Sequence, residues 1–149
     1  DGSIIYENRP DREEVLDKDV AYTTVYMLEK VVDEGTARRL RGTWKEYGGF
    51  TNAIAGKTGT TQGNADAWFI GMTPELVAGV WVGCDNPSVS FATTAMGQGA
   101  NAALPVWARF FKKLQADSNM NFDWKKEFSK PNDLAFELDC EKHYENPFE

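Results

Sequence analysis

The residues best suited to chemistry in this sequence lie in one short stretch, Ala-Gly-Lys-Thr-Gly-Thr-Thr at residues 55–61. Its lysine and threonines can donate hydrogen bonds to an anion, because an ammonium group and a hydroxyl are both donors. Gly59, between two threonines, leaves room for a ligand backbone to come close. The stretch therefore predicts a site for an anionic ligand, with phosphate and carboxylate as the two candidates.

The phosphate interpretation would make Gly-Lys-Thr at residues 56–58 the end of a P-loop. That motif also requires a glycine five positions before Gly56, and the residue there is Thr51. A P-loop lysine opens a helix, whereas Gly59 and Gly63 would interrupt a helix at once. We therefore reject nucleotide binding by this stretch.

The carboxylate interpretation rests on Lys-Thr-Gly at residues 57–59, an element of penicillin-binding proteins and class A β-lactamases. The context makes it specific: Asp-Ala-Trp-Phe-Ile-Gly follows at residues 66–71 and Val-Ala-Gly-Val-Trp-Val-Gly at 77–83. Upstream, residues 31–37 read Val-Val-Asp-Glu-Gly-Thr-Ala. Over residues 17–114 the chain resembles the transpeptidase domain of bifunctional, class A penicillin-binding proteins.

This resemblance implies roles for the residues of the strand. The terminal carboxylate of a D-alanyl-D-alanine stem peptide is expected to meet the Lys57 ammonium and the hydroxyls of Thr58 and Thr60. Gly59 would admit the substrate backbone, and Thr61 belongs to the same substrate-binding set. The backbone N–H of Thr60 is implied as an oxyanion donor, so Lys57 and Thr60 are the predicted catalytic residues. No metal or cofactor is implied.

The family's nucleophile lies in a Ser-x-x-Lys element, which this sequence lacks. None of its five serines, at positions 3, 88, 90, 118 and 129, has a lysine three positions later. Ser-x-Asn is absent too, and we attribute the Tyr-x-Asn triplets ending at Asn8 and Asn146 to chance. We therefore expect the serine and the acylating half of the domain to precede Asp1, and this chain alone to be inactive.

The reaction implied for the intact enzyme is peptidoglycan D,D-transpeptidation, with β-lactams as substrate mimics that acylate the serine. The resemblance also implies an extracytoplasmic location, with an amino-terminal membrane anchor and a glycosyltransferase domain outside this chain. Two alternatives stay open at this point. One is a β-lactamase or D,D-carboxypeptidase, and the other is a non-catalytic penicillin-sensing domain.

The elements expected to position the strand form an α+β fold with an antiparallel sheet meander and packed helices. Strands are predicted at residues 53–60, 65–71 and 76–83, because the intervening turns are too short for helical crossovers. The lysine strand should lie at an edge, and the strand at 76–83, apolar at nearly every position, should be covered on both faces. Four aromatic residues are expected in the core: Trp68, Phe69, Trp81 and Trp107.

Helical spacing predicts a first helix that begins at Asp17 or Asp19 and ends before Gly35, followed by a short turn at residues 36–40. Residues 88–99 should be a loop. A second helix should cover the sheet, with Asn101 as a possible cap and Pro105 in its first turn. Its predicted buried face consists of Ala103, Val106, Trp107, Phe110 and Leu114.

Composition sets the outer limits of these interpretations. The 149 residues suffice for one domain, and a net charge of -7 without a basic stripe excludes a nucleic-acid binding surface.

We divide the chain into residues 1–116, the carboxyl-terminal part of the transpeptidase domain, and 117–149, a polar extension. Residues 1–10 suggest a hairpin remnant. Cys84 and Cys140 are expected to be free thiols, and His143 lacks the partners of a metal site.

Overall fold

A computed structural model describes residues 13–43, 46–135 and 137–138 of the chain. Its helices and strands are α1 (Lys18–Asp33), β1 (Ala55–Thr60), β2 (Ala67–Met72), β3 (Val77–Val82), α2 (Thr94–Gly97), α3 (Gly99–Ala102) and α4 (Leu104–Ala116). Two short 3-10 turns, Arg38–Leu40 and Gln62–Asn64, are also present. The predicted α+β class is confirmed.

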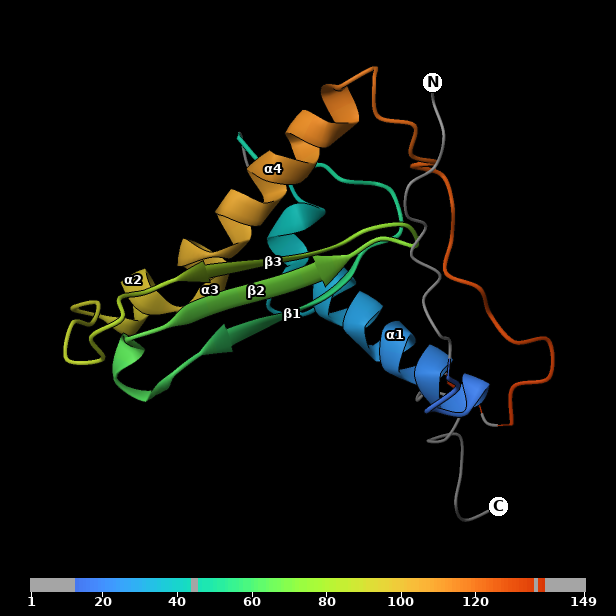
Figure 1. The fold of residues 1–149 in the computed structure, drawn as a ribbon, viewed down its shortest axis with the longest axis horizontal. Helices are drawn as coiled ribbons and strands as arrows, with labels where there is room; N and C mark the ends of the chain where they lie inside the picture. The colour runs from blue at the N-terminus through green and yellow to red at the C-terminus, as the bar shows by residue number, and fades with distance from the viewer. Residues whose placement is uncertain (1–12, 44–45, 136, 139–149) are drawn as a thin grey trace, which may run out of the picture.

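The sheet is an antiparallel meander with strand order β1-β2-β3, as predicted (Figure 1). The lysine strand β1 is therefore an edge strand, and β3 forms the opposite edge. Each strand begins one or two residues later than expected because the first predicted residues still belong to the preceding turns. In the second turn, the Thr73 hydroxyl accepts the N–H of Leu76 at 3.2 Å, which closes the connection between β2 and β3.

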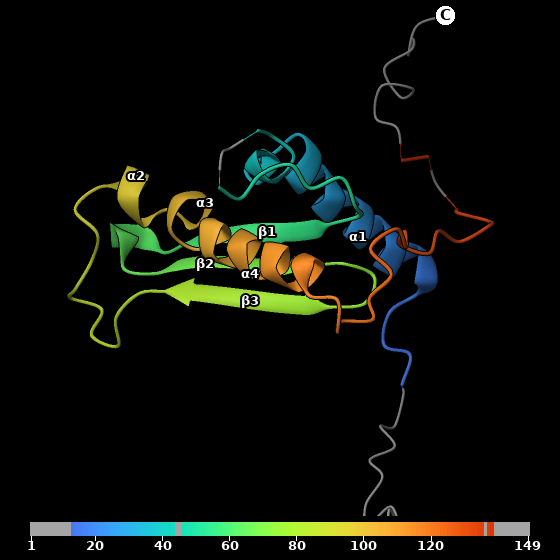
Figure 2. The ribbon, with the colours of Figure 1, turned by 90° about the horizontal axis from the view of Figure 1, so that it is seen from above.

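Helix α4 covers one face of the sheet, where it lies over β2 and β3 in the view of Figure 2 and is inclined to the strands in that of Figure 1. The Trp107 ring meets the Phe69 ring edge-on at 5.3 Å between centroids, and its indole N–H donates to the carbonyl of Ala78 at 3.0 Å. Phe111 stacks on Trp107 at 3.8 Å. A Cβ at Gly71 would lie 2.7 Å from the Trp107 ring, so a residue without a side chain lets the helix dock this closely.

The opposite face of the sheet is open, which corrects the prediction that residues 76–83 are covered on both faces. Val77 is 64% exposed, and Trp81, predicted to be in the core, is 41% exposed. Trp68 and Ile70 on β2 are exposed as well, so the core prediction is also wrong for Trp68, although Phe69 and Trp107 are fully buried. The physical reason is that the helices of the described residues pack against one face only.

The buried face of α4 differs from the predicted one. Its fully buried residues are Leu104, Trp107, Ala108 and Phe111, whereas Val106 and Phe110 are 48% and 45% exposed. Adjacent apolar residues allow two overlapping stripes, and docking onto the sheet selects the stripe that contains Trp107 and Phe111.

The segment before α4 is also more helical than expected. Asn101 lies within α3 and does not cap α4, which begins at Leu104 with Pro105 in its first turn, as predicted. The predicted loop at residues 88–99 contains α2, which is capped by the hydroxyl of Thr93.

Helix α1 has the predicted start and end. The Asp17 carboxylate accepts the N–H of Asp19 at 2.8 Å, which satisfies one of the free donors of the first turn. After Asp33 the chain turns through the expected short segment, where Ala37 and Leu40 enter the core beside Val32. The end of α1 thus packs against the same hydrophobic core as α4.

The segment after α4 runs along the body of the molecule. Trp124 meets the Phe111 ring edge-on at 6.3 Å, and the N–H of Asp123 donates to the Glu75 carboxylate at 2.9 Å. Further along, the N–H of Ala135 donates to Asp19 at 3.0 Å. A boundary between residues 116 and 117 remains a prediction.

Several predictions fall on residues outside the described ranges. These are the hairpin remnant at residues 1–10, the thiol of Cys140 and the position of His143. Cys84 is a free, exposed thiol, as expected. Within the described ranges, no helix has the length and hydrophobicity needed to cross a membrane.

Candidate functional site

The open edge of β1 beside Lys57 carries the backbone N–H groups of Thr58 and Thr60, which are directed away from the sheet. Thr60 lies opposite Ala67, and the next residue, Thr61, donates its N–H to the carbonyl of Asp66 at 3.0 Å. This arrangement makes Thr60 and Ala67 a non-hydrogen-bonded pair of the antiparallel ladder. The N–H of Thr60 therefore points to the open side of β1, and by alternation so does that of Thr58. Such an edge can accept a ligand backbone as an added strand.

The Lys57 ammonium lies at this same edge. Lys57 is exposed and is the cross-strand partner of Ile70, so its side chain leaves the strand on the open face of the sheet. Its Nζ lies beside the strand and donates to the carbonyl of the next residue, Thr58, at 2.8 Å. This hydrogen bond holds a positive charge beside the outward backbone groups of β1.

The hydroxyls of Thr58 and Thr60 are held by groups from other elements. The Thr58 hydroxyl lies 3.0 Å from the hydroxyl of Thr36, just after α1. The Thr60 hydroxyl accepts the N–H of Gly99, the first residue of α3, at 3.1 Å. A hydroxyl that accepts a hydrogen bond still has its own proton to donate, so the Thr60 contact leaves a donor for a ligand.

Gly59 and Thr61 are placed differently from each other. A Cβ at Gly59 would lie 3.2 Å from the Cβ of Trp68, so the bare backbone of Gly59 opens onto the exposed face of β2. Thr61 is in the turn beyond β1, where its hydroxyl donates to the Asp66 carboxylate at 3.2 Å and accepts the Asp66 N–H at 2.8 Å. The other Asp66 oxygen accepts the indole N–H of Trp81 at 2.9 Å. Asp66 thus ties the end of β1 to β3.

The structure therefore brings Lys57, Thr58, Gly59 and Thr60 together on one strand edge, and leaves Thr61 one residue beyond it. Sequence reasoning did not assign a role to Thr36 or Gly99, which reach the strand from 22 and 39 positions away. Asp66 and Thr36 were inside segments that carried the family resemblance. No signal in the sequence singled out Gly99.

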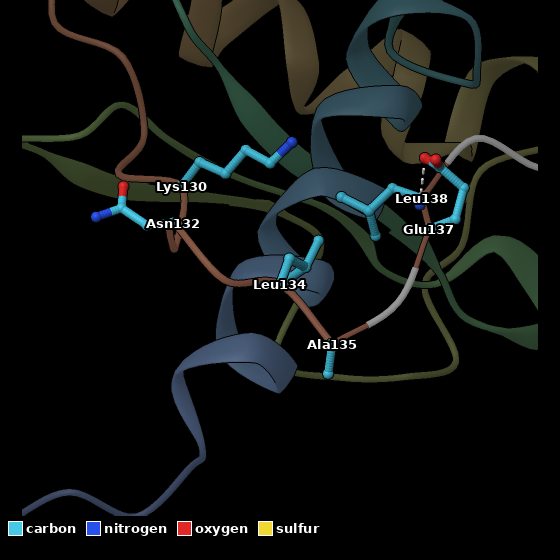
Figure 3. A pocket seen from close by; sticks show the side chains of 6 residues that line it. All are labelled: Lys130, Asn132, Leu134, Ala135, Glu137 and Leu138. Atoms are coloured by element: carbon cyan, nitrogen blue, oxygen red, sulfur yellow. Dashed lines mark hydrogen bonds between the residues drawn. The ribbon is translucent and has the colours of Figure 1, made fainter.

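A pocket of about 380 Å³ lies elsewhere, in the segment after α4 beside α1 (Figure 3). Its lining residues are Lys130, Asn132, Leu134, Ala135, Glu137 and Leu138. None of them belongs to β1, so this pocket is separate from the strand edge. Among the residues that the structure describes, no group of three or more His, Cys, Asp or Glu side chains is placed to hold a metal ion.

Comparisons with known proteins identify the family of this chain. The family model of the penicillin binding protein transpeptidase domain matches residues 3–116. Penicillin-binding protein 1A of Aquifex aeolicus is 42% identical over 111 residues, which cover 74% of this chain and 14% of that protein. Penicillin-binding protein 1B of Vibrio cholerae is 30% identical over 152 residues, covering 99% of this chain and 18% of its own length.

A solved structure shows the same fold. The crystal structure of penicillin-binding protein 1A from Haemophilus influenzae matches with a TM-score of 0.61 and 25% identity, over 79% of this chain and 17% of that one. The chain thus spans less than a fifth of the length of each of these three proteins. With the family model matched over most of its residues, the chain belongs to the penicillin-binding-protein transpeptidase family, as a carboxyl-terminal part of the transpeptidase domain of class A members.

Proposed function

We propose that this chain supplies the substrate-carboxylate and oxyanion strand of a peptidoglycan D,D-transpeptidase. The observation that carries the proposal is the open edge of β1, where the Lys57 ammonium lies beside the outward N–H groups of Thr58 and Thr60. A stem peptide ending in D-alanyl-D-alanine would lie along this edge as an added strand. Its carboxylate would meet Lys57 and the two threonine hydroxyls, with Thr61 at the end of the substrate-binding set.

The proposed chemistry is acyl transfer through a serine ester. The serine oxygen bonds to the carbonyl carbon between the two D-alanines, the C–N bond breaks, and the departing amine takes a proton. The amine of a second stem peptide then attacks the ester and returns a proton to the serine. The N–H of Thr60 would stabilise the oxyanion in both steps, and Lys57 would hold the carboxylate and bias proton transfer near the serine.

In this proposal the serine comes from the preceding half of the domain, since no Ser-x-x-Lys occurs in this chain. That half would also cover the open sheet face that carries Trp68, Ile70, Val77 and Trp81. The intact protein would be extracytoplasmic, with its membrane anchor and glycosyltransferase domain outside the present sequence, and residues 117–149 would form an extension of the domain.

The test uses the full-length protein that contains this chain. Incubation with benzylpenicillin should give a stable serine adduct by mass spectrometry, and an adduct should not form on the present chain alone. With stem peptides and an acceptor amine, the enzyme should release D-alanine and form a cross-linked product.

The alternatives predict other products. A D,D-carboxypeptidase would release D-alanine without cross-linking, a β-lactamase would turn penicillin over, and a penicillin sensor would be acylated without processing stem peptides. Any of these results, or a stable adduct on the isolated chain, would contradict the proposal.

A further inference from the structure

Thr36 is a residue outside the strand that reaches the proposed carboxylate site. It follows α1 by three positions and is exposed, while its hydroxyl lies 3.0 Å from the hydroxyl of the half-buried Thr58. Sequence spacing places these residues 22 positions apart, so the contact depends on the packing of the end of α1 against β1.

The turn that carries Thr36 is held in place by its neighbours on both sides. Gly35 donates its N–H to the carbonyl of Lys30 at 3.0 Å, and Ala37 donates to that of Val31 at 3.0 Å. Ala37 itself is fully buried in the core. The backbone on either side is therefore fixed, and the Thr36 hydroxyl is held at a defined position over β1.

The direction of the hydrogen bond between the two hydroxyls decides what Thr58 can offer a ligand. Each hydroxyl has one proton and two lone pairs, so one of the pair must donate to the other. If Thr58 donates to Thr36, it turns lone pairs toward an incoming carboxylate, which repels them. If Thr36 donates to Thr58, the Thr58 proton stays free for the carboxylate and is polarised by the bond that its oxygen accepts.

We propose that Thr36 is a positioning residue that donates to Thr58 and thereby directs the Thr58 proton toward the substrate carboxylate. This inference rests on the proposed function, because it needs a carboxylate bound at the edge of β1. Thr36 then contributes to recognition of acidic acyl donors without belonging to the Lys-Thr-Gly element.

The experiment measures single-turnover acylation of the full-length enzyme by benzylpenicillin and by its methyl ester, in which an uncharged ester replaces the carboxylate. Thr36→Val should slow acylation by the acid about three- to tenfold, as expected for one lost hydrogen bond, and should change acylation by the ester much less. Thr36→Ser, which keeps the hydroxyl, should stay within about twofold of wild type. In a Thr58→Val background, Thr36→Val should cause no further loss, since the two residues act as a pair.

Thr24→Val is the matched control, because Thr24 is an exposed threonine of α1 whose hydroxyl donates to the carbonyl of Val20. It should leave both rates unchanged. A wild-type rate for Thr36→Val, an equal loss with acid and ester, or additive losses in the double variant would overturn the role of Thr36. If wild type forms no adduct, or if Lys57→Ala and Thr58→Val both react at the wild-type rate, the proposed function itself fails.

Discussion

At the residue scale, Lys57 and Thr60 are expected to act through different atoms. Lys57 contributes a side-chain ammonium, held along the edge of β1 by the carbonyl of Thr58. Thr60 contributes its backbone N–H, whose direction is set by the pairing of β1 with β2. A side-chain substitution therefore tests the role of Lys57 directly. The role of the Thr60 N–H is tested by a substitution elsewhere that displaces β1.

Lys57→Ala in the full-length protein should lower the rate of penicillin acylation by about ten- to a hundredfold or more, because the proposed charge-assisted contact to the carboxylate would be lost. The melting temperature should move by only a few degrees, since Lys57 is exposed and contributes little to the core. Stopped-flow acylation and thermal unfolding of the same variant give both quantities. Lys113→Ala, at an exposed lysine of α4, is the matched control. Near-wild-type acylation of Lys57→Ala would remove this lysine from the site.

At the element scale, the sheet was predictable from the sequence because its turns leave little choice. Connections as short as residues 62–64 and 73–75 force neighbouring strands to be antiparallel. The buried face of α4 was not predictable, because Phe110 and Phe111 are adjacent and only docking against Phe69 shows which is buried. The contacts of Thr36 and Gly99 with β1 escaped prediction for the same reason, since packing of distant segments creates them.

Contact between α3 and β1 should control the position of the Thr60 N–H. An ideal Cβ at Gly99 would lie 2.2 Å from the carbonyl oxygen of Trp68 and 2.6 Å from that of Gly59, which are both backbone atoms with little freedom to move. Gly99→Ala in the full-length enzyme should therefore displace the end of β1 and reduce the acylation rate constant about ten- to a hundredfold.

The rate constant must be separated from the amount of folded enzyme to test this prediction. Single-turnover kinetics give the rate constant from the observed rate and the amount of folded enzyme from the amplitude of the reaction. Gly79→Ala is the matched control in the same sheet, because its Cβ would meet only Ile70 at an ordinary 3.5 Å. A smaller amplitude with an unchanged rate constant would show that Gly99 serves folding alone.

At the scale of the whole molecule, the segment after α4 is attached to the sheet through Glu75. Its carboxylate accepts the N–H of Asp123 and binds the Lys126 ammonium at 3.0 Å. Both contacts lower the pKa of Glu75 below its ordinary value of 4.5, and the hydrogen bond from the Asp123 backbone has the larger effect. A carboxyl group whose pKa is lowered by folding stabilises the folded state at pH values above its ordinary pKa. This stabilisation is lost as the pH falls through the lower pKa of the folded state. The attachment should therefore persist at neutral pH and weaken below pH 4.5.

The N–H of Asp123 provides a direct measurement of this attachment. Its NMR chemical shift in this chain should report the titration of Glu75 with a midpoint below 4.5, and Glu75→Gln should remove that component. Glu34→Gln, which removes an exposed carboxylate paired with Lys30 on α1, should leave it unchanged. A midpoint at or above 4.5 would contradict the assigned cause.

The open sheet face should make the isolated chain prone to self-association. Trp68 and Trp81 lie side by side on it, 6.2 Å apart between ring centroids, with Ile70 and Val77 nearby and exposed. Light scattering of the chain alone should show species larger than a monomer, and Trp81→Lys should shift them toward the monomer. A wild-type chain that stays monomeric at the same concentration would contradict the prediction.

The outward N–H groups of Thr58 and Thr60 have a kinetic consequence for the resting protein. Because neither is directed to a strand of the sheet, both should exchange their hydrogens with water quickly, while the N–H of Thr61, bonded to Asp66, exchanges slowly. A ligand that pairs with this edge would slow the first two without altering the third. Deuterium uptake at these neighbouring positions would therefore report occupancy of the edge before any covalent bond forms, and would separate binding from acylation.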